Sequence, residues 1–209
     1  MPLILFLLLI IVCLLFVLRK LRIINRDLKL KIAEDVQFLQ QISRIDPVTQ
    51  VMDQQQFSHL LSQEWQRARR SQKPLAVIVC DVDYLGLFNS THGQLAGDEA
   101  LFAIAQTLDS TVKRAGECVG RLGGDEFWIL LPNINQNDAV DLAKLLQSKI
   151  HGLAIAHEAS PISEIMTVSM GLSSILPTES LYLQDFQRAV ELACAEAKTE
   201  GRDRWCVTD

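Results

Sequence analysis

Two pairs of carboxylates have the residue types and the spacing for metal-dependent phosphate chemistry. Asp81 and Asp83 follow an apolar run, and Asp125 and Glu126 follow a pair of glycines. Carboxylate oxygens are the ligands that Mg²⁺ and Mn²⁺ prefer, and paired glycines leave the backbone open to a phosphate group. The simpler alternatives are a solvated Gly-Gly-Asp turn at the second pair and an Asx turn or helix cap at Asp83.

The pair Gly123-Gly124 stands between two apolar runs, 118–122 and 127–131, which predicts a β-hairpin with the carboxylates at its tip. A two-residue turn at the glycines uses positive φ, which glycine adopts without steric cost. Side chains alternate along the returning strand. We therefore expect Asp125 and the residue two places further on to share one face, and Glu126 to take the other.

The run before Asp81 predicts a central strand that is covered on both faces. Residues 75–80 are continuously apolar and several are β-branched. The carboxyl end of such a strand is where α/β sheets bind ligands. At a spacing of two residues, Asp81 and Asp83 are expected to project to the same side.

Helical and strand patterns alternate along the rest of the chain. They predict an α/β (α+β) sandwich with a mixed central sheet, helices on its faces and the β-hairpin that carries the second pair of carboxylates. Asp53 is the expected cap of the first helix, and Gly201 the expected residue after the last. The expected helices are 54–71, 94–113, 138–150 and 184–200, and the further strands are 165–175 and 205–207.

The chain begins with the pattern of a membrane anchor. Residues 3–18 are all apolar, enough for about 24 Å of helix, close to the thickness of a bilayer core. Arg19, Lys20 and Arg22 flank only one end of this run, so the positive-inside rule places the C-terminal part in the cytoplasm. A cleaved signal peptide would need a basic start and a small-x-small site, which are absent, and a buried core helix is the third alternative.

A heptad-like stripe follows the basic cluster, with apolar residues in steps of three and four. We expect a parallel two-helix coil that forms a homodimer, and a single amphipathic helix resting on its own domain is the alternative. The stripe consists of Leu21, Ile24, Leu28, Ile32, Val36, Leu39 and Ile42. Asp46-Pro47 ends this helix. The expected domains are an anchor at 1–20, a coil at 21–45 and a globular domain at 46–209.

Composition narrows the class of function. The chain has 209 residues, 49% of them hydrophobic, and a net charge of −5. The acidic balance argues against a nucleic-acid partner. The five cysteines are scattered without a C-x-x-C spacing, which favours a reducing compartment and argues against zinc or a disulfide framework.

With these motifs in place, the chain resembles the GGDEF family of bacterial diguanylate cyclases. The resemblance rests on Arg-x-Gly-Gly-Asp-Glu-Phe at 121–127 and on flanking blocks in family order, and it extends from residue 46 to about residue 207. The flanking blocks are Asp46-Pro-Val-Thr49, Asp81-Val-Asp83, Asn89, Gly97-Asp98, Thr167-Val-Ser-Met-Gly171 and Lys198-Thr-Glu-Gly-Arg202.

The resemblance implies an enzyme that condenses two GTP molecules into cyclic di-GMP and pyrophosphate, with one GTP on each domain of a dimer. It also implies that Asp81, Asp125 and the carbonyl of Val82 hold Mg²⁺ or Mn²⁺. Glu126 matches a residue that holds a second metal or removes a proton, and these two roles remain open. Metal ions of this kind neutralise a triphosphate and activate the attacking hydroxyl.

The resemblance further implies a substrate site for GTP. Asn89 and Asp98 match the readers of the guanine edge, and the Gly-Gly pair lies beside the phosphates. Lys198 and Arg202, expected one helical turn apart, match the phosphate clamps. For these two cations the alternative is the ordinary preference of a helix C-terminus for positive charge.

Four positions depart from the family pattern. The usual Phe, Lys, Asp and His are replaced by Leu85, Gly86, Ser90 and Gln94, and a histidine, His92, stands two places early. The missing lysine is a phosphate contact, so we expect reduced activity. The alternative is a catalytically silent domain that acts as a GTP or cyclic di-GMP receptor or scaffold. A purely structural coiled-coil protein would leave the carboxylates unexplained.

A candidate product-inhibition site precedes the hairpin. Arg114-Ala-Gly-Glu117 stands where the family has Arg-x-x-Asp, and the glutamate keeps the charge while adding a methylene. The alternative for Arg114 and Glu117 is a solvated surface pair.

Overall fold

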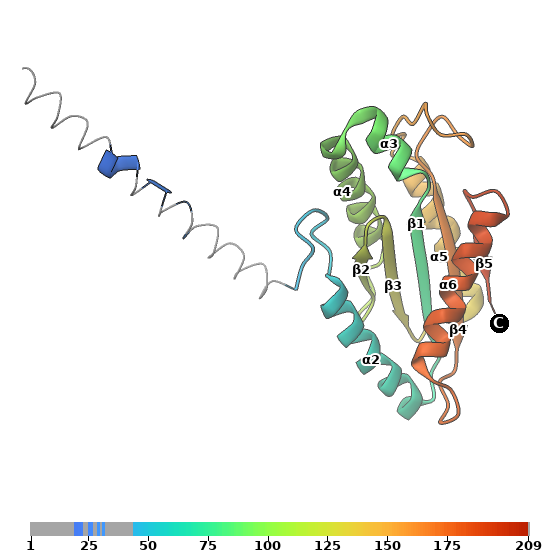
Figure 1. Cartoon of the computed structure of the whole chain (residues 1–209). Coiled ribbons are helices and arrows are strands. Elements are labelled where there is room, and N and C mark those ends of the chain that lie inside the picture. Colours follow the sequence, from blue (N-terminus) through green and yellow to red (C-terminus); the bar gives the residue numbers. More distant parts are fainter. Residues whose placement is uncertain (1–18, 23–24, 27–28, 30, 32–43, 209) are drawn as a thin grey trace, which may run out of the picture. The chain divides into compact units, whose positions relative to one another are not determined.

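The computed structural model describes residues 19–22, 25–26, 29, 31 and 44–208 (Figure 1). The chain forms two units, Met1–Ser43 and Arg44–Asp209. The described residues of the first unit are helical. The predicted anchor at 1–20, apart from Arg19 and Lys20, and the predicted coil stripe, apart from Leu21, lie outside the described residues. Within the described part of the chain, no helix is both long and apolar enough to cross a membrane.

The second unit is built on a mixed five-stranded sheet in the order β2-β3-β1-β4-β5. β1 (Leu75–Val82) is central, as predicted, and pairs antiparallel with β3 (Glu126–Pro132) and with β4 (Val168–Ile175). β2 (Cys118–Gly123) pairs antiparallel with β3, and β5 (Trp205–Val207) closes the opposite edge parallel to β4. The predicted mixed sheet is confirmed.

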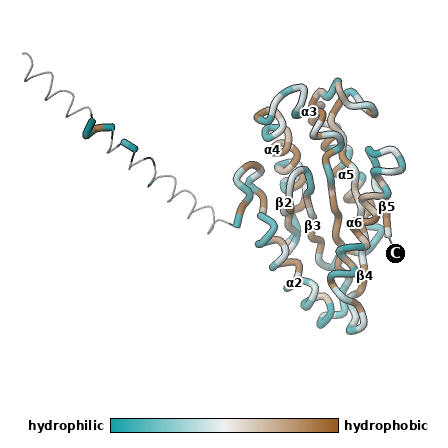
Figure 2. Tube along the Cα trace, in the orientation of Figure 1, coloured by the Kyte–Doolittle hydropathy of each residue, from teal (hydrophilic) through white to brown (hydrophobic). Residues whose placement is uncertain are grey.

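Helices cover both faces of this sheet (Figure 1). On one face α2 (Gln54–Ser71) and α6 (Leu183–Thr199) pack over alternate residues of β1, beginning with Leu75. On the other face α4 (Gln94–Thr111) and α5 (Gln136–His151) pack over the intervening residues. Figure 2 shows hydrophobic residues along the central strands. Every residue of β1 is buried, which accounts for the unbroken apolar run at 75–80 within this strand.

Several predicted boundaries are confirmed by their caps. The Asp53 side chain accepts a hydrogen bond from the backbone N–H of Gln56 at 2.7 Å and starts α2. Gly201 follows the end of α6 with φ +118°. The helix predicted at 138–150 begins earlier, because the Asn135 side chain caps it. The strand predicted from residue 165 begins only at Val168.

One helix, α3 (Leu85–His92), was not predicted. It follows β1 directly, through Tyr84 in left-handed backbone with φ +56°. A glycine, Gly86, lies inside it, and glycine is unfavourable in a helix interior. The helix has eight residues and buries only Leu85 and Phe88, so its sequence carries little helical periodicity.

Candidate active site

Asp81 lies at the carboxyl end of β1, and it meets a cation from α6. Its Oδ2 atom is 2.7 Å from Nζ of Lys198. Asp81 is only 6% exposed. The two side chains meet because alternate residues of β1 from Leu75 onward face α6, the helix on which Lys198 occupies the last turn.

The hairpin tip differs from the prediction by one residue. Gly123 still belongs to β2 and pairs with Glu126, so the two-residue turn consists of Gly124 and Asp125. Gly124 has φ +48°, a left-handed conformation that favours glycine. The register between the strands shifts between Arg121 and Gly123, and this irregularity moves the turn. The backbone carbonyl of Asp125 accepts a bond from the N–H of Val82 at 3.1 Å, which ties the tip to β1.

Glu126 lies directly opposite Asp81 in the antiparallel register of β1 and β3. Directly opposed residues share one face of a sheet. The cross-strand neighbour of Asp81 is therefore Glu126, whereas Asp125 lies in the turn and not on the strand. The Glu126 carboxylate accepts a hydrogen bond from the indole N–H of Trp128. Trp128 is 1% exposed and was not among the predicted site residues. Its position two residues after Glu126 on the same strand could have predicted that the two side chains share a face.

These positions form what we call the carboxylate cluster: Asp81, Asp125 and Glu126. Burial, together with the negative charges of Asp125 and Glu126, raises the pKa of Asp81 to about 6 against the opposing effect of Lys198. Burial alone would lower the pKa of Lys198, but its bond to Asp81 outweighs that and raises the pKa. One lysine therefore does not neutralise the cluster.

The residues of the cluster fit a divalent metal ion by their chemistry. Carboxylate and carbonyl oxygens are the donors that Mg²⁺ and Mn²⁺ prefer, and an ion at this place would offset the charge that raises the pKa of Asp81. Among residues 44–208, no three His, Cys, Asp or Glu side chains already converge as a metal site. The Asp81 carboxylate instead forms an ion pair with Lys198.

Asp83 belongs to the framework of the site. Its carboxylate accepts hydrogen bonds from the hydroxyls of Thr167 and Ser169, both at 2.7 Å, and from the backbone N–H of Asp203 at 3.2 Å. It is 2% exposed. Asp83 therefore ties the end of β1 to β4 and to the segment after α6. It forms neither the Asx turn nor the helix cap that the sequence alone suggested.

Lys198 and Arg202 were predicted to lie one helical turn apart, but α6 ends at Thr199, so Arg202 lies outside the helix. Arg202 has left-handed backbone with φ +64°. Its guanidinium lies over the Tyr84 ring, 4.4 Å from the centroid, and donates to the Tyr84 hydroxyl at 3.0 Å. Its Nε atom is 3.8 Å from Asp83. Both predicted phosphate cations thus meet aspartates from the end of β1.

The predicted guanine readers meet at the bend between α3 and α4. Asn89 lies in the last turn of α3, and Gln94 and Asp98 lie at the start of α4. We call these three residues the elbow group. Gly97 makes it possible, since a Cβ atom there would lie 1.8 Å from Oδ1 of Asn89. The structure therefore brings Asn89 and Asp98 together, with Gln94 between them.

The hairpin tip is held from behind by Arg121. Its guanidinium donates to the carbonyl of Gly124, with Nε at 3.0 Å and Nη2 at 2.6 Å, and Nη1 lies 3.0 Å from Oδ1 of Asp46. The same oxygen accepts from the N–H and hydroxyl of Thr49. Arg121 thus positions the turn that carries Asp125, and the Asp46 block supports Arg121.

The diguanylate cyclase GGDEF domain family matches residues 43–204, which include the carboxylate cluster, the elbow group and both phosphate cations. The chain belongs to this family. A probable diguanylate cyclase of Escherichia coli K12, DgcC, is 27% identical over 174 residues, covering 83% of this chain and 46% of DgcC. The GGDEF chain therefore spans about half the length of that relative.

Two Pseudomonas aeruginosa proteins give similar matches to this GGDEF chain. The diguanylate cyclase DgcP is 32% identical over 159 residues, which cover 76% of this chain and 23% of DgcP. The diguanylate cyclase SiaD, whose crystal structure is a complex with its activator SiaC, aligns with a TM-score of 0.71 and 27% identity, over 91% of this chain and 73% of that one. The fold described above is thus the GGDEF fold.

The candidate product site of the GGDEF domain lies between α4 and β2. Arg114 and Glu117 make two local contacts: the backbone N–H of Arg114 donates to Glu117 Oε2 at 2.8 Å, and the backbone N–H of Glu117 donates to the carbonyl of Arg114 at 3.0 Å. Among the ion pairs of residues 44–208, none involves the Arg114 guanidinium. Both residues line a cavity of about 470 Å³ with Lys113, Asp138 and Leu142.

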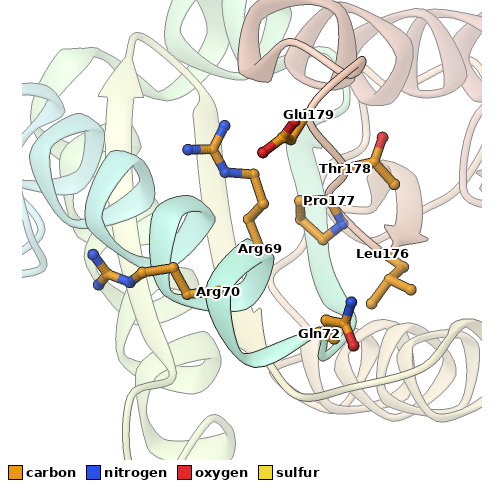
Figure 3. Close-up of a pocket in the computed structure, with 7 residues that line it drawn as sticks. All are labelled: Arg69, Arg70, Gln72, Leu176, Pro177, Thr178 and Glu179. Carbon is orange, nitrogen blue, oxygen red and sulfur yellow. The ribbon is translucent and has the colours of Figure 1, made fainter.

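Another cavity of the GGDEF domain, of about 460 Å³, shares no residue with these sites (Figure 3). It lies between the end of α2, at Arg69 and Arg70, and the loop after β4, at 176–179. Leu75 pairs with Ile175 at that end of the sheet, whereas Asp81 lies at the other end of β1. The cavity is therefore remote from the carboxylate cluster.

Proposed function

We propose that this chain is a diguanylate cyclase that condenses two GTP molecules into cyclic di-GMP and pyrophosphate. The 3′-hydroxyl of each GTP attacks the α-phosphorus of the other, so two phosphodiester bonds form and two pyrophosphates leave. Each domain presents one GTP, so two domains must face each other for turnover. Family membership supports the reaction class, and the site residues support its assignment to this chain.

The observation that carries the proposal is the position of Glu126 opposite Asp81, beside the turn with Asp125. Three carboxylates lie at one end of the sheet with one lysine against them, and the pKa of Asp81 is raised to about 6. Asp81, Asp125 and the carbonyl of Val82 would hold Mg²⁺ or Mn²⁺. When bound, this ion neutralises triphosphate charge and lowers the pKa of the attacking hydroxyl.

The residues of the chain bind and orient the substrate. Asn89 and Asp98 bind the guanine edge, and Gly123 and Gly124 leave room for phosphate at the hairpin tip, where a Cβ atom added to either glycine would meet no atom within 4 Å. Lys198 would then exchange its contact with Asp81 for a contact with a phosphate oxygen, which would leave the Asp81 carboxylate open to a metal ion. Each group of the broken ion pair thereby gains a new partner of opposite charge.

Arg202 is the second phosphate cation, and its stacking on Tyr84 places it. Glu126, held by Trp128, acts either as a ligand of a second metal or as the acceptor of the hydroxyl proton. The variant Glu126→Gln separates these roles, since an amide oxygen still binds a cation but an amide cannot accept the proton. Rescue of Glu126→Gln by raised pH would favour proton acceptance.

The second candidate function is a silent receptor or scaffold that binds GTP or cyclic di-GMP. Gly86, in place of the usual lysine, is the observation that favours it. The two candidates differ in one measurement, the conversion of GTP by the purified full chain in the presence of Mg²⁺. Formation of cyclic di-GMP supports the cyclase. GTP binding without any product supports the receptor.

We also propose that the enzyme is anchored in the bacterial inner membrane by residues 1–20 and dimerises through the coil at 21–45. The apolar run with Arg19, Lys20 and Arg22 at one end, and the heptad stripe, support this. Deletion of residues 1–45 should lower specific activity at low protein concentration and restore it at high concentration, because the coil raises the local concentration of the second domain.

Two results would contradict these proposals. Activity that is independent of concentration after the deletion would remove the role of the coil. Periplasmic activity of a phosphatase fused to the C-terminus, or full-length chain in the soluble fraction, would contradict the anchor and its orientation.

A further inference from the structure

Gln94 joins the two predicted guanine readers within the elbow group. Its Nε2 atom donates to Oδ1 of Asp98 at 3.0 Å, and its Oε1 atom lies 3.5 Å from Nδ2 of Asn89. Both residues therefore direct their hydrogen-bonding groups at the same side chain. The residue at this place differs from the family's usual histidine, so the arrangement depends on a departure from the family pattern.

The orientation of the Gln94 amide is set by its neighbours. A carboxylate only accepts hydrogen bonds, so the NH₂ group of Gln94 faces Asp98 and its carbonyl faces the NH₂ group of Asn89. The other end of the Asn89 amide is closed, because its Oδ1 atom is buried without a hydrogen-bond partner and lies against Gly97. Asn89 can thus offer only a donor to this space.

Guanine presents the same chemical group as Gln94. Its edge carries O6 and N1–H on adjacent atoms of a lactam, which is an amide with its acceptor and donor on one side. A donor from Asn89 and an acceptor from Asp98 are complementary to that pair. They are equally complementary to the primary amide of glutamine, whereas a histidine ring does not carry a carbonyl acceptor beside an N–H donor.

We propose that the Gln94 side chain is an internal substitute for guanine, which holds the base-reading groups of Asn89 and Asp98 and must be displaced when GTP binds. This inference rests on the proposed function, because it takes Asn89 and Asp98 as the base readers. Gln94 then lowers the apparent affinity for GTP, since part of the binding free energy is used to break its contacts. It also keeps the Asp98 carboxylate paired when no nucleotide is bound.

The test compares equilibrium binding by the full chain and its variants, using an unreactive GTP analogue with Mg²⁺ in a calorimetric titration. Gln94→Ala removes the substitute amide, and Gln94→Met keeps a side chain of similar length without hydrogen bonds. Leu95→Ala is the matched control, because Leu95 is the next residue on α4 and is 81% exposed. Thermal melting checks that each variant is folded.

We expect Gln94→Ala and Gln94→Met to bind the GTP analogue about three- to tenfold more tightly than the wild type, and Leu95→Ala to bind it equally. The corresponding ITP analogue should gain by the same factor, because hypoxanthine keeps O6 and N1–H and lacks only the 2-amino group. ATP, whose edge has the reverse order of donor and acceptor, should gain nothing.

Three results would overturn the inference, and they are distinguishable. If the wild type binds the GTP analogue and the Gln94 variants bind it equally or more weakly, Gln94 is not a competitor and the proposed function stands. If the Gln94 variants bind the GTP analogue more tightly than the wild type but bind the ITP analogue equally, the Gln94 amide does not replace the lactam of the base. If no variant and no wild-type protein binds a guanine nucleotide, the proposed function fails and the inference fails with it.

Discussion

Lys198 and Asp81 form an ion pair at the end of β1, with 2.7 Å between Nζ and Oδ2. One is the predicted phosphate cation and the other a predicted metal ligand, so GTP and metal must replace this contact together. The pair also preorganises the site, because it holds both groups at the end of β1 before substrate arrives.

Gly86 marks the place where a cation can be restored. It lies on α3 with ordinary helical backbone, and a Cβ atom added there meets no atom within 4 Å. Gly86→Lys should therefore be tolerated and should raise kcat/KM for GTP. A hydrogen bond to a charged group is worth about 1 to 3 kcal/mol, or about one to two decades in rate.

A matched control for this gain is Leu87→Lys, which adds the same charge at the next residue, itself 44% exposed. Equal gains from Gly86→Lys and Leu87→Lys would assign the effect to general attraction of an anion. In that case the missing family lysine would not explain slow turnover.

The candidate product site predicts weakened inhibition in Arg114→Ala. The Arg114 guanidinium is available to an anion, since the hydrogen bonds between Glu117 and Arg114 involve only the backbone of Arg114. The initial rate should be unchanged, and the concentration of cyclic di-GMP that halves the rate should rise about tenfold, as expected for loss of a charge-assisted contact. Initial rates at increasing product concentration measure this.

Two further variants sharpen the test of the product site. Glu117→Asp restores the shorter acid of the family and should strengthen inhibition, whereas Lys113→Ala, at the neighbouring exposed residue, should change it less than Arg114→Ala. The site would be vestigial if cyclic di-GMP inhibited neither the wild type nor any of these variants.

The ion pair between Arg121 and Asp46 predicts a dependence of stability on pH. Burial would raise the pKa of Asp46, but hydrogen bonds from Thr49 and Arg121 outweigh burial and hold the pKa below its ordinary value. A depressed pKa in the folded state stabilises the fold above the unfolded pKa, about 3.9, and this contribution is lost as the pH falls through the folded value.

The measurement is urea unfolding of the wild type and Asp46→Asn at pH 7 and at about pH 3.5. At pH 7 the variant should be less stable by about 1 to 3 kcal/mol, and the difference should shrink at the lower pH. If the stability difference between the wild type and Asp46→Asn stays constant with pH, Asp46 acts only by its shape.

The variant Arg121→Ala should lower turnover, because it removes the hydrogen bonds that hold the carbonyl of Gly124 at the hairpin tip.

Much of the fold followed from local sequence rules. The unbroken apolar run at 75–80 predicted the buried central strand, and Asp53 and Gly201 predicted helix ends, because these signals depend on neighbouring residues alone. The hairpin was predicted with its turn one residue early, since the irregular pairing between Arg121 and Gly123 is a property of two strands together.

The side-chain contacts of the site could not be predicted in the same way. The contact of Asp81 with Lys198 joins residues far apart in sequence, and the stacking of Arg202 on Tyr84 depends on left-handed backbone at both residues. The elbow group could not be predicted, because Asn89 lies on α3 and the sequence of α3 has too little helical periodicity to predict a helix. The resemblance supplied candidate residues, and the structure supplied their partners.

The most direct measurement of the central claim is the turnover of GTP by the purified full chain with Mg²⁺ or Mn²⁺, followed by chromatography of the products. We expect slow formation of cyclic di-GMP and pyrophosphate, abolished by Asp81→Asn and by Asp125→Asn, because either change removes a ligand from the carboxylate cluster. Leu95→Ala should retain the wild-type rate. If the folded wild type binds GTP but forms no cyclic di-GMP with either metal, the cyclase account is contradicted and the receptor or scaffold account replaces it.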